Sequence, residues 1–407
     1  MFLGLSGLIL LTPFMPKIDV GIPLYPLELL TVLLLPLYRS LVICMYTKIL
    51  VAVTLYSLVS LIVASVFLDV FFIEEFLLLV KYLLPVFLYS ILRMERVSFN
   101  QASLLVLILL VVLNFLYVLL SYFMGGVSVA DAMWGYAHDS RVIGMTGLSL
   151  GVGGLTTIGN NSVAFGVYLS FLVIISFEWY RLKPMMSLFA TVILLAATLF
   201  TYSRSGIVVI AVYFILKAIF LAGRLSISIR MLIGFFSLLP IVYQYGDALG
   251  VVSKLASFSD FSDSSSSIRI GYWVESVKIL FSNVPAFLFG TGYSESIQFL
   301  RHGFANSESL YFTAAVQLGL FGVVGFLLLQ LSFVSRTNGL DDFVVVLSKA
   351  LNYFVPGWIL SCLVGGDLLR TDFFIYFVIL VKATIDNAAS DDFSARQGAL
   401  QQRVLYR

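Results

Sequence analysis

Apolar stretches of membrane-spanning length recur along most of this chain, and they constrain its fold more than any other feature. A bilayer core about 30 Å thick requires roughly 20 apolar residues in a helix. Stretches of this length, or close to it, lie at 1–15, 21–38, 49–68, 71–92, 101–124, 159–177, 185–202, 205–222, 229–246, 307–334, 343–364 and 371–388. We therefore predict an all-α polytopic integral membrane protein with about 12 transmembrane helices.

The composition excludes the soluble classes of protein. Hydrophobic residues make up 60% of the 407 residues and charged residues 11%, against roughly 45–50% and about 25% in ordinary soluble proteins. The net charge of +2 creates no field that would attract nucleic acid. Cys44, Cys362, His138 and His302 form no redox or metal-binding spacing. We expect no metal and no cofactor.

Two segments are too long and too polar to lie in the membrane, at 125–158 and 247–305. More than half of the Lys and Arg residues fall in the loops of the opposite side and in the tail. Because cytoplasmic loops hold the excess of basic residues, we predict cytoplasmic termini and two large periplasmic loops. The expected order is N-terminal helices at 1–124, a first loop at 125–158, central helices at 159–246, a large loop at 247–305, C-terminal helices at 306–388 and a polar tail at 389–407.

Arg204 lies in a Ser-Arg-Ser-Gly sequence inside a 38-residue apolar stretch, at 185–222. At 1.5 Å per residue this stretch is long enough for two spans but leaves no room for a loop, so Arg204 should lie at a tight hairpin. Ser203 or Ser205 can cap the next helix, whose N-terminal N–H groups would face a bound anion. The alternative is an arginine that anchors the hairpin among lipid head groups.

Arg269, Tyr272 and Trp273 follow a serine-rich tract at spacings i, i+3 and i+4, so they share one helical face. An arginine beside aromatic rings suits a phosphate next to a sugar. The same pattern is also typical of an interfacial amphipathic helix with an aromatic belt.

Arg141 precedes a glycine-rich segment that ends in Asn160 and Asn161 at the mouth of a predicted span. Amide side chains at this place are suited to sugar hydroxyls. The alternative is a glycine-rich connection in which one of the asparagines caps the helix.

Glu308 lies where the second large loop enters a span that carries Gly319, Gly322 and Gly325 on one face. These glycines predict close helix packing. A carboxylate at the membrane interface, one helical turn from Tyr311, can accept a proton from a sugar hydroxyl. The alternative is a glutamate in the first turn that stabilises the helix dipole.

The ordered set of these motifs resembles the O-antigen polymerase and O-antigen ligase superfamily of polysaccharide-assembly membrane proteins. The motifs are 201–206 (TYSRSG), Arg269 with Tyr272 and Trp273 followed by 289–292 (FGTG), and 308–311 (ESLY) followed by 317–322 (QLGLFG). The resemblance covers about half of the chain, from Arg141 to Leu328. It implies a GT-C-like architecture with a partly helical second loop.

One departure from the family pattern points to the polymerase branch. Ligase-type members usually carry His-Asn ahead of the Leu-Tyr, whereas this chain has Glu308 and Ser309 there. His302 lies six residues too early to replace that histidine. An acidic residue at this place is similar to the pattern of some polymerases.

The resemblance implies an inverting glycosyltransferase that joins undecaprenyl-pyrophosphate-linked repeat units at the periplasmic face of the bacterial inner membrane. It implies catalytic roles for Glu308, Arg204 and Arg269. The residues that it implies for substrate binding are Arg141, Arg301, Asn160, Asn161, Tyr272, Trp273 and Tyr311. The implied partners are the lipid-linked donor and acceptor, membrane lipids and a chain-length regulator membrane protein.

Two alternatives remain open. An O-antigen ligase would transfer finished polymer to lipid A core. A lipid-linked oligosaccharide flippase or another transporter would need charged residues along a path at mid-membrane, for which Lys81, Lys217 and Lys349 are the basic candidates.

Overall fold

The computed structural model describes most of the helical part of the chain. The described residues are 2–14, 18–19, 23–24, 26–35, 41–68, 73–123, 162–201, 203–220, 264–293, 298, 309–335, 341–364 and 373–405. The predicted span at 229–246 and the first large loop lie outside them.

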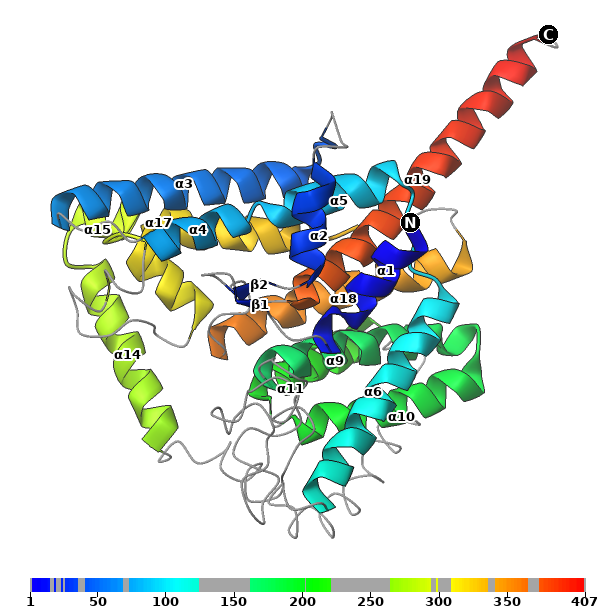
Figure 1. The fold of residues 1–407 in the computed structure, drawn as a ribbon, viewed down its shortest axis with the longest axis horizontal. Helices are drawn as coiled ribbons and strands as arrows, with labels where there is room; N and C mark the ends of the chain where they lie inside the picture. Colours follow the sequence, from blue (N-terminus) through cyan, green and yellow to red (C-terminus); the bar gives the residue numbers. More distant parts are fainter. Residues whose placement is uncertain are drawn as a thin grey trace.

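The described residues are almost entirely helical (Figure 1). The α-helices are α1 (Phe2–Leu11), α2 (Pro26–Leu34), α3 (Met45–Leu68), α4 (Ile73–Lys81), α5 (Leu84–Met94), α6 (Gln101–Phe123), α9 (Ser162–Glu178), α10 (Pro184–Phe200), α11 (Arg204–Phe220), α14 (Ser264–Leu280), α15 (Val284–Phe289), α17 (Leu310–Leu331), α18 (Asp342–Val364) and α19 (Phe373–Leu405). Short 3-10 turns follow α1 and α9, at Thr12–Phe14 and Trp179–Arg181. Strands β1 (Ile18–Asp19) and β2 (Pro23–Leu24) form a minimal antiparallel hairpin, with Ile18 opposite Leu24.

Within the described part, four helical segments are long and apolar enough to cross a membrane. They are Met45–Val66, Glu75–Met94, Leu310–Leu331 and Asp342–Leu363. Helices also form in the other predicted stretches that the structure describes, but α1 and α2 have only ten and nine residues. At 1.5 Å per residue neither reaches across a bilayer core of about 30 Å. Prolines explain their length, because Pro13 follows α1 and Pro36 follows α2.

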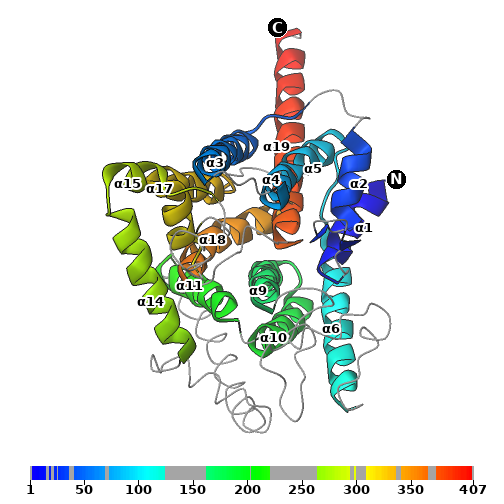
Figure 2. The same ribbon diagram turned by 60° about the vertical axis from the view of Figure 1, so that its left-hand side comes forward.

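Helix α9 forms the centre of the bundle. Residues 165–179 are all buried, as expected of a helix that is apolar on every side. In Figure 2 it lies among α10, α11, α18 and α19, all of which it contacts. Phe171 stacks on Phe354 of α18 with ring centroids 4.4 Å apart, and the ring of Phe377 from α19 lies 5.6 Å away.

Helix α19 binds elements that lie far away in the sequence. The hydroxyl of Tyr376 donates to the buried carboxylate of Glu28 in α2. The backbone N–H of Phe99 donates to the hydroxyl of Thr384 at 2.8 Å. The helix continues to Leu405, so most of the predicted polar tail extends the last helix as one rod (Figure 1).

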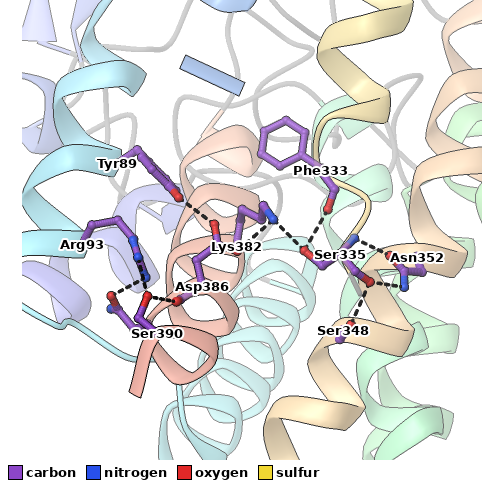
Figure 3. A network of polar contacts seen from close by, with 10 residues as sticks. Tyr89, Arg93, Phe333, Ser335, Ser348, Asn352, Lys382, Asp386 and Ser390 are labelled. Atoms are coloured by element: carbon purple, nitrogen blue, oxygen red, sulfur yellow. Dashed lines mark hydrogen bonds and ion pairs between the residues drawn. The ribbon is translucent and has the colours of Figure 1, made fainter. Parts of the chain in front are cut away.

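A polar network joins α5, α18, α19 and the end of α17 (Figure 3). Lys382 donates to Ser335 Oγ at 2.7 Å and pairs with Asp386 at 2.9 Å. Asp386 also accepts from Tyr89 at 2.6 Å. Asn352 makes two hydrogen bonds to the backbone of Ser335. Its Oδ1 accepts from the Ser335 N–H, and its Nδ2 donates to the Ser335 carbonyl. We call these five residues the polar network.

Helices also occur in the segment that the sequence assigns to the second large loop. The described part of that loop contains α14 and α15, with Asn283 as the N-cap of α15, where its side chain accepts from Ala286 N at 2.8 Å.

Candidate functional site

The hairpin before Arg204 is built as the sequence predicts. Helix α10 ends at Phe200 and α11 begins at Arg204, with Thr201 and Ser203 described between them. Ser203 caps α11, because its hydroxyl accepts from Gly206 N at 3.1 Å. A Cβ on Gly206 would lie 2.6 Å from the carbonyl oxygen of Gly166 in α9. The start of α11 is therefore fixed against the start of α9, the helix that follows Asn160 and Asn161.

Helices α11 and α18 run antiparallel, and their register places Arg204 near the end of α18. The rings of Tyr213 and Tyr353 lie 5.5 Å apart, and Val209 contacts Gly357. Continuing this register by five residues brings the backbone of Arg204 to the level of Cys362.

The residue after Glu308 lies at the same end of α18. Ser309 is fully buried, and its hydroxyl donates to the carbonyl of Cys362 at 3.3 Å. The backbone of Arg204 and that of Ser309 therefore lie at one end of α18, although their positions differ by 105 residues in the chain. We call this region the α18 end.

Helix α14 reaches the α18 end through aromatic packing. Trp273 stacks on Phe312 in the first turn of α17, with centroids 5.5 Å apart and ring planes 22° apart. Tyr272 packs against Ile279 and against Val316 of α17. Arg269 lies one helical turn before Trp273, so α14 brings the backbone of Arg269 toward the helix that follows Glu308.

Helix α17 is broken at Gly319, where the sequence predicts a continuous span. Gly319 has φ +66°, which favours glycine over residues with a Cβ. The two halves fold toward each other, so that Tyr311 donates to Gln330 Oε1 at 2.7 Å across 19 residues. Gly325 keeps the predicted packing role, because a Cβ there would lie 2.7 Å from Val53 of α3.

The carbonyl groups at this break are bonded by a neighbouring loop. Thr291 N donates to the Val316 carbonyl at 2.8 Å, and Gly292 N donates to the Gln317 carbonyl at 3.2 Å. A Cβ on Gly290 or Gly319 would lie 2.4 Å from backbone atoms of the other segment. We call residues 288–293 and 316–319 the backbone junction. It satisfies polar groups that a broken helix would otherwise leave exposed in an apolar environment.

Helix α3 supplies two side chains to the backbone junction that the sequence did not predict. Tyr56 Oη lies 3.1 Å from the Leu318 carbonyl and 3.3 Å from the Phe289 carbonyl. Ser60 accepts from Tyr293 N at 3.1 Å. Tyr56 and Ser60 lie one helical turn apart on α3, but the same helix carries Thr54, Ser57 and Ser65, so the sequence does not single them out.

The sequence-predicted site residues divide into three groups. Tyr272, Trp273 and Tyr311 are described in full, and the structure places the backbone of Arg204 and Arg269. Tyr311 is buried and its hydroxyl donates to Gln330, and its role in substrate binding stays a prediction. The remaining predicted residues lie outside the described part: Arg141, Asn160, Asn161, Arg301 and Glu308.

Two of the three lysines expected inside spans have carboxylate partners. Lys81 pairs with Glu28 at 3.2 Å, and both side chains are at most 6% exposed. Lys217 pairs with Glu178 and lies over the ring of Tyr353, 5.0 Å from its centroid. Each of these two lysines therefore has a carboxylate that neutralises its buried charge. No group of His, Cys, Asp or Glu suited to a metal ion occurs among the described residues.

Part of the chain is similar to one known family. Residues 189–327 match the family model described as O-antigen ligase (Wzy_C). No curated protein matches the chain. The matched segment contains α11, α14, α15 and most of α17, which contribute to the α18 end and the backbone junction. This match supports membership of the chain in the O-antigen polymerase and ligase superfamily.

Proposed function

We propose that this protein is an O-antigen polymerase that joins undecaprenyl-pyrophosphate-linked repeat units at the periplasmic face of the bacterial inner membrane. The observation that carries the proposal is the meeting of the three family motifs. The elements of Arg204 and Arg269 and the helix after Glu308 come from distant parts of the matched segment, yet they gather around the end of α18. Membrane-spanning helices beside them suit a lipid-linked substrate.

Arg204 and Arg269 are the proposed pyrophosphate ligands. The leaving group of such a transfer develops negative charge in surroundings poor in water, and guanidinium groups stabilise it through charge-assisted, bidentate hydrogen bonds. Arg204 is the first residue of α11, so the positive end of the helix dipole also favours an anion there. Arg141 and Arg301 are secondary candidates.

Glu308 is the proposed general base. It would accept the proton of the acceptor hydroxyl as that oxygen attacks the anomeric carbon and the C–O bond to the pyrophosphate breaks, which inverts the anomeric centre. Its neighbour Ser309 is fixed to α18 by a buried hydrogen bond. Fixing the next residue restricts where the carboxylate can lie, which favours proton transfer. Trp273 and Tyr272, with Asn160 and Asn161, are the proposed sugar contacts.

A ligase is the second candidate, because the matching family model is described as O-antigen ligase. Both reactions use a lipid-linked glycan donor and differ in the acceptor. The Glu-Ser sequence at 308–309 favours the polymerase, since ligase-type relatives usually carry His-Asn there.

The test is complementation of a strain that lacks the gene, with lipopolysaccharide resolved on a gel. Glu308→Gln, Arg204→Ala and Arg269→Ala should each abolish the ladder and leave core plus one repeat unit. Loss of every O-unit band would instead indicate a ligase or a flippase. An unchanged ladder in all three variants would contradict the catalytic assignment.

Matched controls come from the same helix as Arg269. Lys278→Ala removes an exposed cation of α14, and Glu275→Gln neutralises an exposed carboxylate. Both should leave the ladder unchanged, because their exposed pair contributes little. Membrane levels of all variants, measured by immunoblot, separate loss of activity from loss of protein.

A further inference from the structure

Helix α14 and the residue that follows it carry a stripe of exposed apolar side chains. Ile270, Val274, Val277 and Phe281 follow the spacing i, i+4, i+7 and i+11, so they form one face. Val274 is 50% exposed and Phe281 67%. Exposed apolar patches of this kind mark contact with a membrane or with another protein. We call these four residues the α14 stripe.

The rest of the helix surface is used differently. Trp273, Tyr272 and Ile279 face α17. Glu275 and Lys278 form an exposed ion pair at 3.0 Å. Helix α14 therefore has a packed side, an apolar exposed side and a polar exposed side, a combination typical of a helix at a lipid–water boundary.

The direction of α14 fits such a boundary. In Figure 1, α3 crosses the upper part of the molecule, while α14 descends steeply at its far end. In Figure 2, α3 is viewed nearly end-on and α14 still runs down the picture. Helix α14 therefore lies crosswise to α3. Since α3 is one of the candidate spans, a crosswise helix at its end lies along the membrane plane.

The α14 stripe continues into the apolar surface of a candidate span. Phe281 contacts Phe287 of α15 with centroids 5.4 Å apart. Phe289, at the end of α15, stacks on Phe321 of α17 at 5.7 Å. Phe321 is 54% exposed and lies beside Tyr56 of α3, a helix long and apolar enough to span a membrane, so its exposed side adjoins lipid. Any molecule that contacts the α14 stripe would therefore also lie next to the lipid beside Phe321.

We infer that α14 is an interfacial helix whose stripe inserts among the acyl chains of one membrane leaflet, with Glu275 and Lys278 on its water-facing side. The same helix carries Arg269 and packs on α17 through Trp273. Lipid contact along the stripe would hold α14 at the height of the lipid head groups. This inference depends on the membrane-spanning character of α3 and stands independently of the reaction.

Spin labels on α14 test this arrangement directly. Single cysteines replace Val274, Val277 or Phe281 in the stripe, or Glu275 and Lys278 as matched controls on the same helix. Cys44 is replaced by Ser, and the fully buried Cys362 remains. All five positions are substantially exposed, so protein burial does not distinguish them. The full-length protein is placed in vesicles of phosphatidylethanolamine and phosphatidylglycerol.

The measurement is the ratio of collisions with oxygen, which dissolves in lipid, to collisions with a water-soluble nickel chelate. We expect a higher ratio at 274, 277 and 281 than at 275 and 278. Equal ratios would contradict the inference and place the stripe in water. Low collision rates with both reagents at the stripe would also contradict it, because another protein surface would then cover it. Gel ladders of the same variants report on the proposed reaction separately.

Discussion

The polar network and the backbone junction hold the C-terminal helices together in different ways. The polar network uses side chains, and its central members Lys382 and Asp386 are both partly exposed. The backbone junction uses N–H and carbonyl groups of residues 288–293 and 316–319, which can approach only where glycine leaves space. The polar network therefore depends on polar side chains. The backbone junction depends on glycines, whose lack of a side chain lets the two backbone segments approach.

This difference predicts different responses to substitution. A side-chain network loses one or two hydrogen bonds at a time, and its remaining members keep partners. Two backbone segments in direct contact have no flexible groups that can move aside for a new atom. Substitutions at the backbone junction should therefore cost more than substitutions in the polar network, even when they add a single methyl group.

The largest effect should follow Gly319→Ala. The added Cβ would lie 2.4 Å from the Leu288 carbonyl carbon, at a residue with φ +66°. We expect a loss of at least about 3 kcal/mol in the free energy of unfolding. Thermal unfolding in detergent measures it. Gly271→Ala in α14 is the control, since nothing lies within 4 Å of its Cβ, and equal melting temperatures would contradict the comparison.

A smaller loss should follow Asp386→Ala in the polar network. The change removes the acceptor of Tyr89 and the partner of Lys382, both partly shielded from water. We expect a loss of about 2 kcal/mol in the free energy of unfolding. A double-mutant cycle with Tyr89→Phe should give a coupling energy of about 1 kcal/mol. Strict additivity would show that the hydrogen bond in Figure 3 contributes nothing.

Tyr56→Phe measures how much a side chain stabilises the backbone junction, because it removes the hydroxyl that α3 contributes there. The ring remains beside Phe321, 6.3 Å away, while the Leu318 and Phe289 carbonyls lose a donor. We expect a loss of about 1 kcal/mol. Thermal unfolding measures it. A loss as large as that of Gly319→Ala would mean that side chains, rather than backbone contacts, dominate this junction.

The smallest effect should follow Asp391→Ala. Its ion pair with Arg96 spans 3.2 Å, but the two side chains are 57% and 74% exposed. Exposed pairs contribute less than about 1 kcal/mol, so the melting temperature should stay close to that of the parent protein. A loss comparable to that of Asp386→Ala would contradict the distinction between shielded and exposed charges.

Local features of the fold could be predicted from sequence because they depend on neighbouring residues. Apolar length indicated the helices, and the Ser-Arg-Ser-Gly sequence indicated a hairpin and a cap at Ser203 or Ser205, of which the structure shows Ser203. The short α1 and α2 were not predicted, since apolar length alone did not account for Pro13 and Pro36. The break at Gly319 was also missed, because three glycines on one face predict close packing equally well.

The candidate site also contains features that could be predicted from the sequence and features that could not. Its motifs could be recognised because each lies within a few residues, and the family match includes three of them. The contributions of Tyr56 and Ser60 could not be recognised from the sequence, because their partners lie more than 230 residues away in the chain. The packing role of Tyr311 depends on Gln330, which reaches it only because α17 folds back. The roles of Glu308, Arg204 and Arg269 stay predictions.

The contacts of α19 have a consequence for biosynthesis. The Phe99 N–H donates to Thr384 and the Tyr89 hydroxyl donates to Asp386, although the members of each pair are separated by at least 285 residues. During translation the N-terminal partners enter the membrane long before α19 leaves the ribosome. Polar groups without partners in lipid cost several kcal/mol each. The early helices should therefore remain loosely assembled in the bilayer until α19 is inserted and completes them.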